Sequence, residues 1–133
     1  MDGESKFRLS SNNLLSFLLA ESYIRKPEDN LNYISSTNRF LEELGKDIDY
    51  FNQTVEADAY GREIAARLEK LYPTETVSNL FSRITSNNIQ DDYIKKIIGV
   101  YKDPRINDNA NRAFFRSIYD FLKEEKRESN STT

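Results

Sequence analysis

Apolar side chains recur at steps of three and four residues along most of this chain, and all three prolines fall between these apolar runs. This spacing places the apolar residues on one face of an α-helix, whereas a β-strand would alternate apolar and polar residues. No stretch sustains such an alternation. The pattern therefore predicts an all-α fold, a single-domain bundle of about six helices.

The expected helices cover residues 10–25, 28–44, 48–72, 75–86, 89–101 and 108–122. Gly45 is expected just beyond the end of the second helix, and Asp47 is expected to cap the next one. Within 48–72 we expect one continuous, bent helix, with a break near Gly61 as the alternative, because one glycine costs only about 1 kcal/mol. Leu18 and Leu41 are expected in the core.

Further capping residues separate the later helices. Thr74, which follows Pro73, is expected to cap the helix that ends before Asn87 and Asn88. These two asparagines are in turn expected to cap the helix that ends before Pro104, and Asp108 to start the last one.

A chain of 133 residues is long enough for one ordinary domain with its own core. We expect a flexible N-terminus over 1–9, a helical domain over 10–125 and a disordered tail over 126–133. The tail is expected because the chain from 123 onward is almost entirely charged and polar.

The sequence contains no histidine and no cysteine. It therefore lacks the most common general base, the thiolate nucleophile and the usual ligands of zinc and iron–sulfur sites. Its acidic pairs are spaced as helix caps and solvated helix faces rather than as catalytic pairs. We expect a protein that is not an enzyme, with no catalytic residues, no metal and no cofactor.

The longest apolar stretch, over 14–20, is interrupted by Ser16 and is far shorter than the roughly 20 residues that span a bilayer. It is followed directly by Glu21, which a signal peptide would not favour. Together with the absence of cysteine, this predicts an intracellular protein, in the cytoplasm or nucleus, without membrane contact.

Charge is uneven along the chain. Residues 1–60 hold 6 basic and 11 acidic side chains, whereas 61–133 hold 13 basic and 11 acidic ones. In the last helix Arg112, Arg116, Tyr119 and Lys123 follow at steps of four, three and four residues, so they share one face. If the last two helices are antiparallel neighbours, the lysines of 95–102 and Arg105 extend this face into a basic patch that contains tyrosines.

Arginine and tyrosine suit a partner that is acidic or phosphorylated and partly apolar. We therefore predict a non-catalytic helical protein-interaction domain, an adaptor or regulatory module that binds such a segment of another protein. The expected partner-binding residues are Lys95, Lys96, Tyr101, Lys102, Arg105, Arg112, Phe115, Arg116 and Tyr119. An ordinary solvated face, with Asp120 and Glu124 neutralising the arginines, remains the alternative for the last helix. For Phe115 the alternative is packing between helices, since two adjacent phenylalanines cannot both be hidden by a narrow apolar stripe.

A second functional hypothesis is a small nucleic-acid-binding regulator that uses the basic C-terminal half. The two helices on either side of Asn87 and Asn88 resemble a helix-turn-helix in spacing. The second of them begins with Asp91 and Asp92, which would repel phosphates where a recognition helix approaches DNA. Nucleic acid is therefore the less favoured partner.

Overall fold

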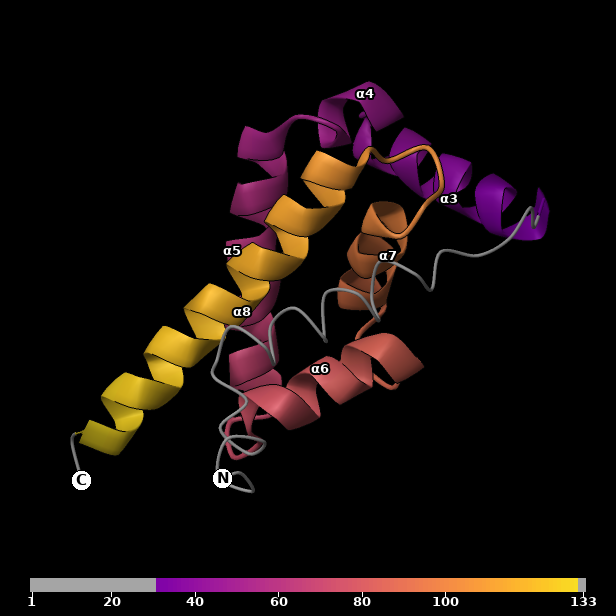
Figure 1. The fold of residues 1–133 in the computed structure, drawn as a ribbon. Helices are drawn as coiled ribbons and strands as arrows, with labels where there is room; N and C mark the ends of the chain where they lie inside the picture. The colour runs from indigo at the N-terminus through magenta and orange to yellow at the C-terminus, as the bar shows by residue number, and fades with distance from the viewer. Residues whose placement is uncertain (1–30, 132–133) are drawn as a thin grey trace, which may run out of the picture.

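The structure is a computed structural model that describes residues 31–131 of the chain, with side chains from 34 to 126. Within these residues it contains six helices and no strand (Figure 1). The helices are α3 (Leu31–Leu44), α4 (Ile48–Phe51), α5 (Thr54–Leu71), α6 (Val77–Ser86), α7 (Asp92–Tyr101) and α8 (Asp108–Ser131). The predicted all-α bundle is confirmed. The flexible segment expected over 1–9, the helix expected over 10–25, and Leu18 lie outside the described residues.

Helices α5 and α8 form the centre of the fold and lie side by side over most of their length (Figure 1). Gly61 makes this close packing feasible, because a Cβ atom at this position would lie 2.6 Å from both the Phe114 carbonyl oxygen and the Ser117 Cβ. The Ser117 hydroxyl also donates a hydrogen bond to the Asp58 carbonyl oxygen at 2.8 Å. Gly61 is therefore a helix–helix contact point.

The helix expected over 48–72 is interrupted at 52–53, so the prediction of one continuous helix is wrong, as is the alternative break near Gly61. The physical reason is the Asn52 side chain, which bonds the loop between α7 and α8. Its Nδ2 donates to the Arg105 carbonyl oxygen at 3.2 Å, and its Oδ1 accepts from the Asn107 backbone N–H at 2.7 Å. These contacts join the α4–α5 connection to a loop more than 50 residues away.

The expected ends near Gly45 and Asp47 are confirmed. Gly45 has a φ of +68°, the left-handed conformation that glycine adopts readily. The Asp47 carboxylate accepts a hydrogen bond from the Tyr50 N–H at 2.9 Å, as an N-cap should.

Two other caps lie further along the chain than predicted. Thr76, rather than Thr74, accepts from the Asn79 N–H and caps α6. Asp91, rather than Asn87 or Asn88, accepts from the Ile94 N–H and caps α7. Asn87 instead ends α6 in a left-handed conformation, with a φ of 58°.

The described core is rich in aromatic rings and spans the facing sides of α5, α7 and α8. Tyr101 stacks on Phe114, and Phe115 meets Phe114 edge to face. Leu41 is only 5% exposed, which confirms its expected burial. Helix α8 continues to Ser131, so most of the stretch expected as a tail from 126 onward is helical.

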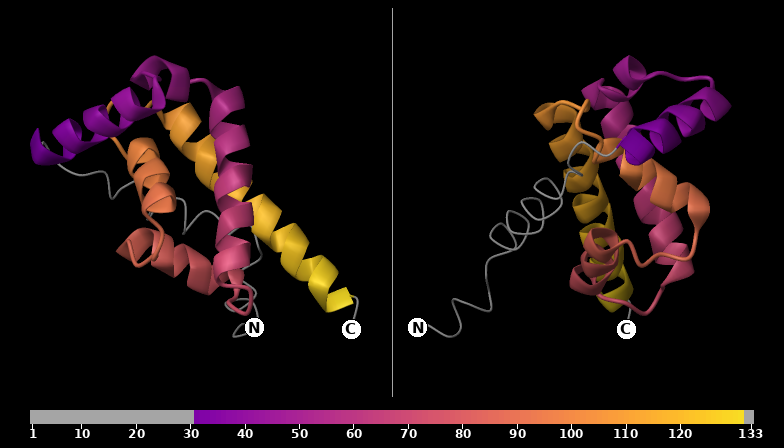
Figure 2. Two further views of the ribbon diagram at one scale, coloured as in Figure 1. Left: turned by 180° about the vertical axis from the view of Figure 1, so that it is seen from behind. Right: turned by 90° about the vertical axis from the view of Figure 1, so that its right-hand side faces the viewer.

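The remaining helices lie on one side of the central pair. Helix α7 packs against α5, and α6 packs against α8 (Figure 2). Helix α3 contacts α7 and otherwise extends away from the central pair (Figures 1 and 2). One long side of α7 therefore faces α3.

Candidate functional site

A groove with a volume of about 410 Å³ lies between α3 and α7. Its residues come from three segments: one turn of α3, the connection between α6 and α7, and one side of α7. They are Ser36, Thr37, Phe40, Asn87, Asp92, Lys95, Lys96, Ile98, Gly99 and Lys102. We refer to this feature as the α3–α7 groove.

The amphipathic pattern of α7 produces the groove wall. Asp92, Lys95, Gly99 and Lys102 follow at steps of three, four and three residues, so they form one stripe along the helix. The opposite side of α7 carries fully buried residues, including Ile94 and Ile97. Core packing of that side turns the polar stripe toward α3.

The base of the groove is apolar. Phe40 on α3 is 8% exposed and Ile98 on α7 is 3% exposed. The Phe40 ring meets the Tyr93 ring edge to face, with centroids 6.4 Å apart, which fixes α3 against α7. The Lys96 ammonium lies 5.5 Å from the centroid of the Phe40 ring, within the range of a cation–π contact.

Tyr93 also connects α7 to α5. Its hydroxyl donates to the Glu63 carboxylate at 3.2 Å, and the Arg67 guanidinium lies 4.5 Å from the centre of its ring. Burial and the neighbouring Glu63 carboxylate raise the pKa of Tyr93 to about 12. The Tyr93 hydroxyl is therefore protonated at physiological pH, and its contacts hold the ring in place beside Phe40.

The three groove lysines differ in their contacts. The Lys102 ammonium donates to the Ile84 carbonyl oxygen at 3.2 Å, where it stabilises the C-terminal end of α6. Among the residues that the structure describes, neither Lys95 nor Lys96 forms an ion pair. Lys95 and Lys96 are therefore the two cations available at this groove.

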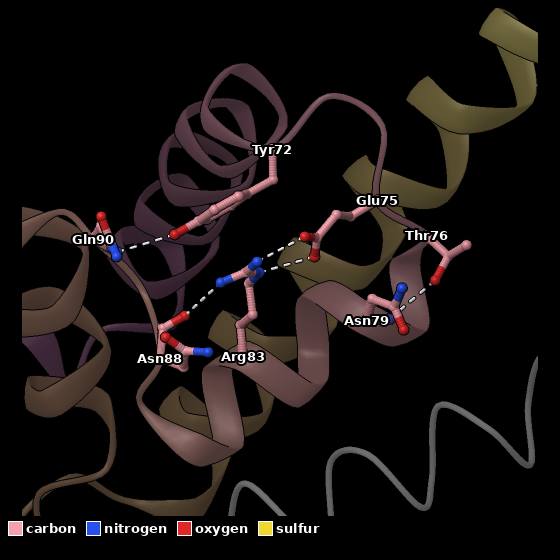
Figure 3. Close-up of polar contacts among 7 residues, drawn as sticks. All are labelled: Tyr72, Glu75, Thr76, Asn79, Arg83, Asn88 and Gln90. Carbon is pink, nitrogen blue, oxygen red and sulfur yellow. Dashed lines mark hydrogen bonds and ion pairs between the residues drawn. The ribbon is translucent and has the colours of Figure 1, made fainter.

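Arg83 fixes the connection that supplies one end of the groove (Figure 3). Its guanidinium binds the Glu75 carboxylate through two hydrogen bonds of 2.8 and 2.7 Å, and it donates a third, of 3.0 Å, to the Asn88 carbonyl oxygen. This joins the α5–α6 connection to the α6–α7 connection beside Asn87. The bidentate contact with Arg83 lowers the pKa of the Glu75 carboxyl.

Tyr72 completes this joint. The Arg83 guanidinium lies 3.9 Å from the centre of the Tyr72 ring, and the Tyr72 hydroxyl accepts a hydrogen bond from the Gln90 N–H at 3.0 Å (Figure 3). Sequence reasoning did not identify this cluster, since Glu75 and Arg83 are eight residues apart and lie on opposite sides of a helix start.

The structure separates the residues predicted to form a single basic patch. Lys95, Lys96 and Lys102 line the α3–α7 groove, whereas Arg112 and Arg116 are exposed on α8, which contributes no residue to the described groove lining. Arg105 lies in the α7–α8 loop, where it donates to the Asp103 carboxylate at 3.0 Å. Because Asp103 is fully buried, the role of this arginine is to neutralise a carboxylate inside the loop.

The aromatic side chains expected to contact a partner lie in the core of the described structure, as the alternative of core packing predicts for Phe115. Tyr101 and Phe115 are fully buried and Tyr119 is 5% exposed. The reason is the width of the buried face of α8, which packs against α5, α6 and α7 at once. Phe81 on α6 approaches Tyr119 with ring centroids 6.2 Å apart, and Tyr101 is stacked on Phe114.

No group of three acidic side chains that could hold a metal ion occurs among the described residues. Nor is any helix in that part of the chain long and apolar enough to cross a membrane. Comparisons of this chain with protein-family models, with curated proteins and with solved structures gave no match.

Proposed function

We propose that this chain is a non-catalytic interaction domain that binds an acidic, partly apolar segment of a partner protein in the α3–α7 groove. One observation carries the proposal: Lys95 and Lys96, which have no acidic partner among the described residues, flank the apolar base formed by Phe40 and Ile98.

An acidic segment with an apolar side chain would satisfy both parts of the groove. The apolar side chain would cover Phe40 and Ile98, and its carboxylates would pair with the two lysines. Because Lys96 is exposed and Lys95 half-buried, each such ion pair contributes up to about 1 kcal/mol. The groove volume of about 410 Å³ is within the range of sites that hold a few side chains.

Nucleic acid remains the second candidate, and the arrangement at α7 disfavours it. Asp91 and Asp92 begin the helix that would have to approach phosphates, and Asp92 lines the groove itself. A carboxylate there would repel a polyanion, so a protein segment of mixed composition suits the site better.

The first experiment captures partners of the full chain from its native cells, with and without nuclease, and identifies them by mass spectrometry. The double variant K95E/K96E is compared with R112E/R116E, which makes the same change in net charge on α8. We expect a nuclease-resistant partner that is lost with K95E/K96E and retained with R112E/R116E.

The second experiment maps the captured partner to a synthetic peptide and measures its affinity by calorimetry. The binding segment should be acidic, and its affinity should fall as salt increases, mainly through slower association. Equal loss of binding in both double variants, or a binding segment without acidic residues, would contradict the proposed site. If capture is lost with nuclease and the affinity falls steeply with salt, the hypothesis of a nucleic-acid-binding protein would be favoured instead.

A further inference from the structure

The charges along the α7 side of the groove occur in a fixed order. Asp92 is at the N-terminal end, Lys95 and Lys96 come about one turn later, and Lys102 is at the C-terminal end. At 1.5 Å per residue, Asp92 and Lys102 are separated by about 15 Å along the helix axis. A bound segment therefore meets a negative group first and then three positive groups, of which Lys102 also donates to the Ile84 carbonyl oxygen.

The two ends of the groove are unequal as anion sites. At the N-terminus of α7 the Asp91 carboxylate already accepts from the Ile94 N–H at 2.9 Å, and Asp92 adds a second negative charge beside it. At the other end the Lys102 ammonium donates to the Ile84 carbonyl oxygen. Negative groups of a ligand are consequently kept away from the N-terminus of α7, and Lys95 and Lys96 are the first cations beyond it.

The groove also lacks the features that favour a phosphoryl group over a carboxylate. No arginine is among its described lining residues, so bidentate recognition by a guanidinium is absent from that set. A phosphate dianion beside Lys95 would lie about one helical turn from the Asp92 carboxylate, where repulsion increases with ligand charge.

We propose, on the basis of the proposed function, that the groove selects a segment by the order of its charges. The bound segment places carboxylates at Lys95 and Lys96 and a basic side chain at Asp92. The groove also binds carboxylates more tightly than phosphoryl groups. An apolar side chain beside the carboxylates, toward the C-terminal end of α7, covers Phe40 and Ile98. The order fixes the direction of the segment, with its basic end toward the N-terminus of α7.

The test uses the full ¹⁵N-labelled chain and three synthetic helical peptides of about 15 residues. The first carries a lysine, two glutamates about one helical turn later, and a leucine beside the glutamates on the side away from the lysine. The second replaces both glutamates with phosphoserine, and the third replaces the lysine with glutamate. Amide shifts report binding even when it is weak, and we expect them at Phe40, Lys96 and Ile98.

We expect the first peptide to bind several-fold more tightly than the other two. In the variant Asp92→Lys this preference should reverse, so that the all-acidic third peptide binds more tightly than the first. Asp120→Lys makes the same charge change on the exposed side of α8 and should leave the preference intact. If Asp92→Lys does not fold, Asp92→Asn should still remove the preference between the first and third peptides.

The outcomes separate the inference from the proposed function. Tighter binding of the phosphoserine peptide, or an Asp92→Lys variant with unchanged preference, would overturn the charge-order inference and leave an acidic-segment groove standing. Absence of amide shifts at the groove with all three peptides at millimolar concentration would overturn both.

Discussion

The ring of Tyr101 at the end of α7 stacks on the ring of Phe114 in α8, with centroids 4.2 Å apart and planes inclined by 12°. This pair lies in the middle of the described core, where Phe51 of α4 also meets the Tyr101 ring edge to face. Helices α4, α7 and α8 are therefore joined through one tyrosine. Burial raises the pKa of the Tyr101 hydroxyl far above its usual range, which keeps this tyrosine neutral.

Phe115→Ala should destabilise the protein strongly, because the side chain is fully buried beside Phe114. Removing a buried phenylalanine ring typically costs about 3–5 kcal/mol of unfolding free energy. Chemical denaturation of the variant measures the loss. Arg116→Ala, one residue further along and exposed, is the control and should change stability little. A loss below about 1 kcal/mol for Phe115→Ala would place this ring outside the core.

Gly61→Ala should also destabilise, although alanine is the better helix former by about 1 kcal/mol. The added methyl group would lie 2.6 Å from the Phe114 carbonyl oxygen, so α5 and α8 would have to separate. We expect a net loss of about 1–3 kcal/mol in thermal or chemical unfolding. The control Ala66→Gly is exposed on the same helix and should lose only the propensity difference. An increase in stability for Gly61→Ala would contradict the close packing of the two helices.

Asn52→Ala should loosen the junction between the α4–α5 connection and the α7–α8 loop. Water can replace the Asn52 side chain at the Asn107 N–H and the Arg105 carbonyl oxygen, because both hydrogen bonds are exposed, so we expect a loss of only about 0.5–1.5 kcal/mol. Hydrogen exchange at Asn107 should speed up more than exchange in the middle of α5. Gln53→Ala, exposed and adjacent, serves as the control. Unchanged exchange at Asn107 would show that the side chain does not hold this loop.

Glu75→Gln should reduce stability at neutral pH and have less effect in acid. The folded-state pKa of Glu75 is lowered by Arg83, so its carboxylate stabilises the fold above the unfolded-state pKa, near 4.5. This contribution is lost as pH falls through the folded-state pKa. Chemical denaturation of the wild-type protein and of Glu75→Gln between neutral pH and about pH 3 measures this contribution. The difference between their free energies of unfolding should narrow below about pH 4.5. A difference independent of pH would exclude the ionised pair as its cause.

Most of the helices could be predicted because each carries its own signal. The apolar periodicity, Gly45 and the Asp47 cap are local features, and a helix end depends on residues within one turn of it. The break at 52–53 could not be predicted, since it depends on contacts between Asn52 and backbone groups of the 105–107 loop. Local propensity over 48–72 favours a helix, and a distant loop overrides it.

Less of the candidate site than of the fold could be predicted from the sequence. Periodicity predicts that Lys95 and Lys102 share one side of a helix, and both residues line the groove. It does not report that α3 covers that side, because no sequence feature of α3 specifies its neighbour. The sequence left open whether Phe115 is buried, because an adjacent pair such as Phe114 and Phe115 is buried together only when several helices surround α8.

The Asn52 side chain has one further consequence, which concerns covalent modification. Asn52, Gln53 and Thr54 form the acceptor sequence for N-linked glycans, and the sugar would be attached at the Asn52 Nδ2. In the folded chain this nitrogen donates to the Arg105 carbonyl oxygen at 3.2 Å, at a joint between two connections. This acceptor nitrogen is therefore already engaged in the folded chain, and a glycan on it would replace one of its two N–H bonds beside the 105–107 loop.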